Sequence, residues 1–249
     1  MTSLSLGRRL QTKRLDLSRV TLVSATNIDP RPNLRALEIS RVGIQFAEVV
    51  LITRLSPLRK VKDIRVEVIQ GLSSGYDEFS RFMLFELYKH IRTEFALFVH
   101  HRAHVVRPRL WKDEFLTYDY VGAPWAPQTH FTNEGLEVRV GNGGFSLRSQ
   151  RLMRAPSQLN LSFTDNGTGF FHEDGQLCVY HRHELETHGV RFAPVDVAAQ
   201  FSTEQPVPET VEKPFGFHNN RSAVPKLYFL RNWINRRFQT ISEPADGNN

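Results

Sequence analysis

The sequence predicts an α/β domain with a mostly parallel sheet flanked by helices, and three observations support this prediction. Short β-branched runs alternate with segments of helical periodicity between residues 20 and 99. The chain has 249 residues, which suits one medium domain with a sizeable core. Cys178 is its single cysteine, so a disulfide framework and a cysteine-built zinc site are both excluded. We therefore expect one domain held by an ordinary hydrophobic core in a reducing compartment.

The individual elements follow from short apolar runs and from their spacing. Runs of this kind between turn-forming residues predict buried strands, and they occur at residues 20–25, 49–53, 64–69 and 95–99. Apolar residues at helical spacing predict helices at residues 32–46 and 76–91. The order strand, helix, strand, strand, helix, strand is typical of a parallel sheet covered by helices. Ligands bind beyond the carboxyl ends of such strands, so we expect chemistry directly after residue 99.

The second half of the chain is richer in loops. A proline in the first turn predicts a short helix at residues 108–116. Gly141, Asn142, Gly143 and Gly144 then form a turn of residues that tolerate positive φ, before a regular segment at 145–152. Such a turn lets backbone N–H groups approach a ligand, and a purely structural turn is the alternative.

The net charge of +6 is carried by basic residues that are scattered along the chain. Nucleic-acid motifs and aromatics interleaved with a basic stripe are absent, so we expect no nucleic-acid partner. A nucleotide diphosphate donor, an anionic membrane or a solvated basic surface would each account for the charge. We find no leader-like or membrane-spanning apolar stretch, which predicts a soluble cytoplasmic protein with at most peripheral membrane contact.

The chain organisation has four expected parts. Residues 1–16 form an N-terminal extension, 17–224 a single domain, 225–241 an amphipathic helix and 242–249 a disordered tail. The segment at 225–241 combines apolar residues at helical spacing with several basic residues. It would lie at the inner face of an anionic membrane, or alternatively dock on its own domain.

Five ordered blocks resemble a bacterial family of glycosyltransferase-like domains that long lacked an assigned function. They are the YDYVGAPW block at 118–125, the glycine-rich block at 141–149, the acidic residues at 172–174, RFAP at 191–194 and FGFH at 215–218. The resemblance covers residues 20–218 and implies a GT-A-like, Rossmann-like fold. It also implies transfer of a sugar from a nucleotide-sugar donor to a hydroxyl acceptor, with inversion.

The resemblance also implies roles for particular residues. Asp174, or failing that Glu173, is the candidate general base that deprotonates the acceptor hydroxyl; acidic residues in the first turn of a helix are the alternative explanation. The glycine turn is expected to line the donor or acceptor pocket. Trp125 would stack on a sugar ring or pack in the core. His218 is the candidate ligand of a divalent cation, Mn²⁺ or Mg²⁺, or else an ordinary histidine.

One position departs from the family pattern. After the fourth strand the family carries an Asp-Gly pair, whereas this chain has Arg102 and Ala103. Arg102 would replace the metal by binding the diphosphate directly. Alternatively, His100, His101 and His104 with His218 form a substitute metal site, although strand alternation places His100 and His104 on one face and His101 on the other. In the remaining alternative the protein binds carbohydrate or nucleotide-sugar without turnover.

Overall fold

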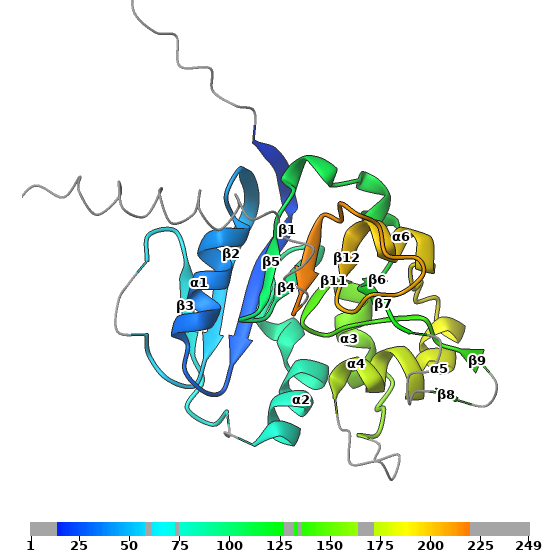
Figure 1. Cartoon of the computed structure of the whole chain (residues 1–249). Coiled ribbons are helices and arrows are strands. Elements are labelled where there is room, and N and C mark those ends of the chain that lie inside the picture. The colour runs from blue at the N-terminus through cyan, green and yellow to red at the C-terminus, as the bar shows by residue number, and fades with distance from the viewer. Residues whose placement is uncertain are drawn as a thin grey trace, which may run out of the picture.

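The fold is built on a six-stranded sheet with the strand order β3-β2-β1-β4-β11-β6 (Figure 1). The computed structural model describes residues 14–57, 61–72, 75–126, 132–133, 136–163 and 172–219. The strands of this sheet are β1 (Leu15–Thr26), β2 (Ile44–Thr53), β3 (Arg65–Val68), β4 (Phe95–Val99), β6 (Tyr120–Val121) and β11 (Phe145–Ser149). Strands β3, β2, β1 and β4 pair in parallel, and β11 runs antiparallel to both β4 and β6. The prediction of a mostly parallel α/β sheet is therefore confirmed.

The helices of the first half are shorter than the sequence predicts. Helix α1 (Arg31–Ser40) ends before the predicted residue 46, because a turn with Gly43 at φ 76° leads straight into β2. Helix α2 (Tyr76–Phe85) likewise stops early and is followed by a separate 3-10 helix, η1 (Leu87–His90). The apolar periodicity of the sequence thus located both helices, but it placed their carboxyl ends several residues too late.

The second half contains short elements. They are β5 (Ala103–Val105), η2 (Pro108–Leu110), η3 (Asp113–Thr117), β7 (Ala123–Pro124), β8 (Thr132–Asn133), β9 (Leu136–Glu137), β10 (Val140–Gly141), α3 (Gln150–Gln158), α4 (Glu173–Gly175), the π-helix η4 (Gln176–Tyr180), α5 (Arg182–Thr187), α6 (Val195–Phe201), β12 (Ser202–Thr203) and β13 (Gly216–His218). The single helix predicted at 108–116 is wrong. Extended backbone at Trp111 and Lys112 separates η2 from η3, and the Trp111 ring packs edge-on against Phe115 and Phe215.

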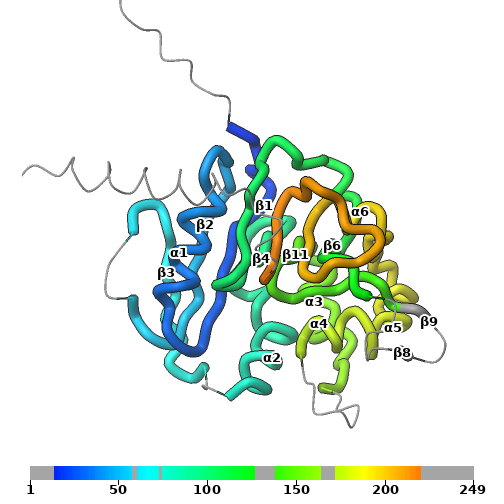
Figure 2. Tube along the Cα trace, viewed as in Figure 1, coloured from blue at the N-terminus to red at the C-terminus, as the bar shows by residue number. Residues whose placement is uncertain are grey.

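Each face of the sheet has its own hydrophobic core. Alternate residues of β1 point to opposite faces, so that Leu22 packs with α1 and α6 whereas Val23 packs with α2 and α3. Figure 2 shows α1 near the β3 edge of the sheet and α3 to α6 gathered near β11 and β6.

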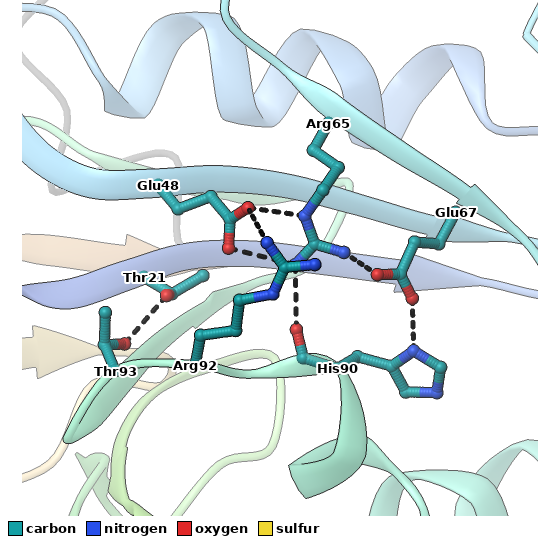
Figure 3. Close-up of polar contacts among 7 residues, drawn as sticks. All are labelled: Thr21, Glu48, Arg65, Glu67, His90, Arg92 and Thr93. Carbon is teal, nitrogen blue, oxygen red and sulfur yellow. Dashed lines mark hydrogen bonds and ion pairs between the residues drawn. The ribbon is translucent and has the colours of Figure 1, made fainter.

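An ion-pair network fixes the opposite end of the sheet, near the amino ends of β3 and β4 (Figure 3). Arg65 donates to Glu48 (Nη2 to Oε2, 2.9 Å) and to the carbonyl oxygen of His90 (2.9 Å), and it also pairs with Glu67. His90 bonds to Glu67, and Arg92 lies 3.9 Å from Glu48. Two carboxylates and two guanidinium groups balance each other here, so this network ties β3 to the segment before β4.

No helix within the described residues is long and apolar enough to cross a membrane. The predicted amphipathic helix at 225–241, the tail at 242–249 and residues 1–13 of the predicted extension lie outside the described part of the chain.

Candidate functional site

Four segments that are distant in sequence meet at the carboxyl end of β4. The first is the turn after the strand, where the His100 backbone N–H donates to the Gly144 carbonyl oxygen at 2.8 Å. The second is the glycine turn itself, whose Gly143 N–H donates to Asp174 Oδ2 at 2.8 Å. The third is the acidic loop at 172–174, which supplies Asp174 to that bond. The fourth segment is the end of β13, where His218 pairs with Ala103 of β5. The blocks singled out in the sequence therefore converge on one place, and it is the edge expected for ligands of a parallel sheet.

The glycine turn is needed for space more than for unusual backbone angles. A Cβ atom at Gly143 would overlap the Glu173 carboxylate, and one at Gly144 would overlap the His218 imidazole. Within the turn only Asn142 has a positive φ, of 78°. The Gly144 N–H is bonded to Asn142 Oδ1 at 3.0 Å, just as the Gly143 N–H is bonded to Asp174. These two N–H groups are therefore occupied within the protein, and the turn holds the acidic loop and the histidine in place. That the turn also lines a donor or acceptor pocket stays a prediction.

Asp174 lies in the three-residue helix α4, which continues directly into η4. Its carboxylate is half-buried and accepts hydrogen bonds from the N–H groups of Gly143 (2.8 Å) and Gly175 (2.9 Å). Burial and, second, the negative charge of Glu173 raise the pKa of Asp174 to about 6, although the Gly143 bond acts in the other direction. A carboxylate with a pKa near the working pH is suited to take a proton and later release it.

Glu173 has a different environment from its neighbour. Its side chain is only 11% exposed and accepts a hydrogen bond from Arg148 Nη2 at 2.9 Å. Arg148 is itself 1% exposed, is bonded to Ser146 Oγ at 2.9 Å, and lies over the rings of Phe98 and Tyr120. This carboxylate is engaged in a buried ion pair, whereas that of Asp174 accepts only backbone N–H groups, so Asp174 is the better placed of the two for an acceptor hydroxyl.

Arg148 is a residue that the sequence interpretation passed over. It stands within the glycine-rich block at 141–149 but points into the core from β11. The only signal was a charged residue in a short strand beside Phe145 and Leu147, and a buried charge requires a partner. That partner, Glu173, lies in the next block along the chain.

His100, His101 and Arg102 form a turn instead of continuing β4. His101 Nδ1 lies 3.1 Å from His100 Nε2, and the His100 ring centroid lies 5.9 Å from that of His218. His104 is instead in contact with Phe217. The predicted grouping of His100 with His104 is therefore wrong, because strand alternation does not extend through a turn.

The histidines at this turn, His100, His101 and His218, are the candidate ligands for the predicted divalent cation. Burial, then the neighbouring charges of His101, His218 and Arg102, lower the pKa of His100 to about 3. His218 Nδ1 is bonded to Glu204 Oε1 at 2.8 Å. Among the residues that the structure describes, no group of three or more histidine, cysteine or acidic side chains is arranged to hold a metal. Imidazoles beside the exposed guanidinium of Arg102 do not form the oxygen-rich site that Mg²⁺ requires, whereas neutral imidazoles can ligate Mn²⁺. A divalent cation at His218 therefore stays a prediction.

Trp125 is buried, with 5% of its surface exposed, and its ring lies directly against Gly141. The core-packing alternative therefore holds, and the expectation that this ring stacks on a sugar is wrong. The exposed aromatic side chain beside the acidic loop is Tyr76, which is 59% exposed and hydrogen-bonded to His172 Nδ1. Sequence periodicity could not single out Tyr76, because exposure of a residue in the first turn of a helix depends on what packs beside it.

The block at 118–125 packs against the segments that carry the site. Asp119 accepts hydrogen bonds from Ser149 Oγ (2.5 Å) and from the Arg191 backbone N–H (2.9 Å). Strand β6 pairs with β11, and β7 pairs with β10 at the start of the glycine turn. This block therefore supports the glycine turn through its pairing with β10 and β11, and its role is structural.

Comparison with known proteins places this geometry in context. The model of a family described as protein of unknown function, DUF5672, matches residues 61–218. An active-site mutant of LgtC is similar in structure with a TM-score of 0.50 and 11% identity, over 87% of this chain and 95% of that one. Mouse xyloside xylosyltransferase 1 has the same TM-score and identity, over 85% of this chain and all of that one (100%).

A second LgtC structure, a galactosyltransferase in complex with donor and acceptor sugar analogues, gives a TM-score of 0.47 and 11% identity over 92% of this chain and 97% of that one. No curated protein matches the sequence. At these identities the likeness establishes the fold alone, which is that of the GT-A glycosyltransferases.

Proposed function

This chain belongs to the DUF5672 family and has a glycosyltransferase fold, and we propose that it transfers a sugar from a nucleotide-sugar donor to a hydroxyl acceptor. The observation that carries the proposal is the placement of the Asp174 carboxylate, which is bonded to the glycine turn at the carboxyl ends of the parallel strands. It is held by the same glycine turn that contacts His218 and His100. The proton acceptor Asp174 thus lies on one side of the glycine turn, and Arg102 and the imidazoles of His100 and His218 lie on the other.

The proposed step is a single displacement with inversion. The acceptor oxygen forms a bond to the anomeric carbon while its proton passes to Asp174. The bond between that carbon and the phosphate oxygen breaks, and the nucleoside diphosphate leaves with the electron pair. A carboxylate that already accepts two backbone N–H bonds keeps lone pairs for a third partner, the acceptor hydroxyl.

Arg102 is proposed to stabilise the departing diphosphate. It is exposed at the turn after β4, where its charge is felt by both His100 and His101. A guanidinium binds phosphate oxygens in a bidentate manner and offsets the charge that develops on the leaving group. In this proposal Arg102 takes the place of the family's aspartate and of the metal that an aspartate would hold.

A panel of UDP- and GDP-sugars offered with simple glycosides as acceptors tests the proposal. Release of UDP or GDP that depends on the acceptor is expected, and NMR of the product reports whether the anomeric configuration is inverted. Asp174→Asn should lower turnover by roughly two to four orders of magnitude. Asp196→Asn, at an exposed aspartate in the first turn of α6, is the matched control and should leave turnover unchanged.

A protein that binds nucleotide-sugars without turnover is the second candidate, favoured by the charge reversal at Arg102. Thermal shift separates the two, because a ligand at a hundred times its dissociation constant stabilises the fold by about 2.7 kcal/mol. Stabilisation by a nucleotide-sugar with no product from any acceptor would favour the binding protein. Turnover that persists in Asp174→Asn would contradict the assigned base.

A further inference from the structure

Tyr76, which is exposed, and His172, which is half-buried, form an aromatic pair that the proposed chemistry does not use. The Tyr76 hydroxyl is hydrogen-bonded to His172 Nδ1, and the two rings meet edge to face with centroids 4.8 Å apart at 80°. Tyr76 is 59% exposed, which is more than most large apolar side chains in the described residues. The hydrogen bond fixes the ring orientation while leaving much of the ring in contact with solvent.

The pair lies beside the general base. His172 directly precedes Glu173 and Asp174, and α2, which begins at Tyr76, packs against α4. Partial burial, followed by the negative charges of Glu173 and Asp174, raises the pKa of Tyr76 above its usual value. The hydroxyl therefore remains protonated at neutral pH and lies within the field of both carboxylates.

The same pair is anchored to the carboxyl edge of the sheet. Asn27, in the loop after β1, donates from Nδ2 to the Gly75 carbonyl oxygen at 2.9 Å. This bond ties the beginning of α2 to the end of β1, so the Tyr76 ring is held on the ligand side of the fold. A rigid, half-exposed ring next to a catalytic carboxylate has the properties of a binding platform.

We propose that Tyr76 and His172 form the acceptor subsite and that the acceptor is a pyranoside, whose apolar C–H face packs on the Tyr76 ring. This inference rests on the proposed function, because it takes Asp174 as the base. The general base must reach the acceptor hydroxyl, so a surface adjoining Asp174 belongs to the acceptor. The donor diphosphate is assigned to the other side of the glycine turn, where Arg102 and His218 lie.

Saturation-transfer NMR on the full-length protein tests the subsite with methyl glycosides of galactose, glucose, mannose and xylose as probes. In the native protein we expect transfer to the C–H protons of at least one probe. Tyr76→Phe should retain it, whereas Tyr76→Ala should abolish it. Val42→Ala is the matched control, since Val42 is 55% exposed at the amino edge of the sheet. Binding of UDP and GDP should be the same in all four proteins.

The outcomes separate this inference from the proposed function. Glycoside binding that needs Tyr76, without sugar transfer, would support the subsite and contradict the transferase. Sugar transfer with an acceptor KM that Tyr76→Ala leaves unchanged would overturn the subsite and leave the transferase intact. Loss of UDP or GDP binding in Tyr76→Ala would assign the ring to the nucleotide, and no saturation transfer from any probe to the native protein would also overturn the inference. Where transfer is detected, we expect Tyr76→Ala to raise the acceptor KM at least about tenfold, equivalent to about 1.4 kcal/mol, with the donor KM unchanged.

Discussion

Replacing the proposed base should make the protein more stable at neutral pH while it abolishes transfer. The pKa of Asp174 rises from 3.8 to about 6 on folding, so the folded state binds the proton more tightly than the unfolded chain. For a raised pKa, the stabilising contribution is complete below pH 3.8 and is lost as the pH rises through 6. At about 1.36 kcal/mol per unit, the ionised carboxylate costs the fold about 3 kcal/mol at neutral pH.

Asp174→Asn removes this cost but also removes one acceptor. The amide has a single oxygen, whereas the carboxylate accepts from both Gly143 and Gly175. Losing one such bond costs about 1 kcal/mol at every pH. We therefore expect a net gain of about 2 kcal/mol in the free energy of unfolding near pH 7.5.

The change in this stability difference with pH is the sharper measurement. The lost hydrogen bond costs the same at every pH, so it does not contribute to that change. Between pH 4.5 and pH 7.5, the stability of the variant relative to the native protein should increase by about 2 kcal/mol, the remainder of the 3 kcal/mol falling below that range. Urea unfolding at several pH values measures this difference, with Asp196→Asn as the control for an exposed aspartate. A difference that is flat with pH, or that decreases, would refute the assignment of a buried carboxylate with a raised pKa.

Three further predictions concern the rest of the chain. Arg102→Ala should weaken UDP or GDP binding roughly tenfold, as expected for loss of an exposed charge-assisted contact, and EDTA should leave transfer nearly unchanged; loss of activity in EDTA that Mn²⁺ restores would count against this. Arg148→Met should lower the free energy of urea unfolding by about 3–5 kcal/mol because Glu173 is left buried and unpaired, whereas combining it with Glu173→Gln should recover most of the loss; equal losses in both variants would contradict the pairing. The segment at 225–241 is proposed to bind anionic membranes, each basic residue near the surface contributing about 1 kcal/mol. Sedimentation with anionic vesicles at low salt measures this, and binding that survives deletion from Pro225 onward would contradict it.

The sequence predicted the parallel half of the fold well because its signals are local. The apolar runs at 20–25 and 95–99 fall inside β1 and β4, and the alternation with helices follows from short connections. The helix after β1 was overextended because apolar periodicity continues through Gly43 into β2, where Ile44 serves the strand instead. Pairing of β11 with β4, and of β13 with β5, joins segments far apart in the chain and has no local signature.

The sequence identified several residues that lie together at the candidate site, but not the contacts that each of them makes there. Asp174 and His218 were selected from the acidic and histidine-containing blocks, and the structure brings both to the glycine turn. Whether an aromatic ring is buried or exposed depends on tertiary packing. Trp125 was therefore considered for sugar stacking although it is buried, and the exposed Tyr76 was missed. The pairing of Arg148 with Glu173 was hidden for the same reason, because a buried charge is identified only when its surroundings are known.

The glycine turn also fixes the spacing between two contacts of the candidate site. Gly143 is bonded to the proton acceptor and Gly144 lies against the imidazole, so neighbouring residues touch the two ends of the proposed reaction. Consecutive Cα atoms are about 3.8 Å apart, and no side-chain rotamer can alter that separation. The main chain therefore sets the spacing of these two contacts along the turn. Changes in sugar preference should accordingly arise from the surrounding loops, whereas any insertion between residues 143 and 144 should abolish transfer for every donor.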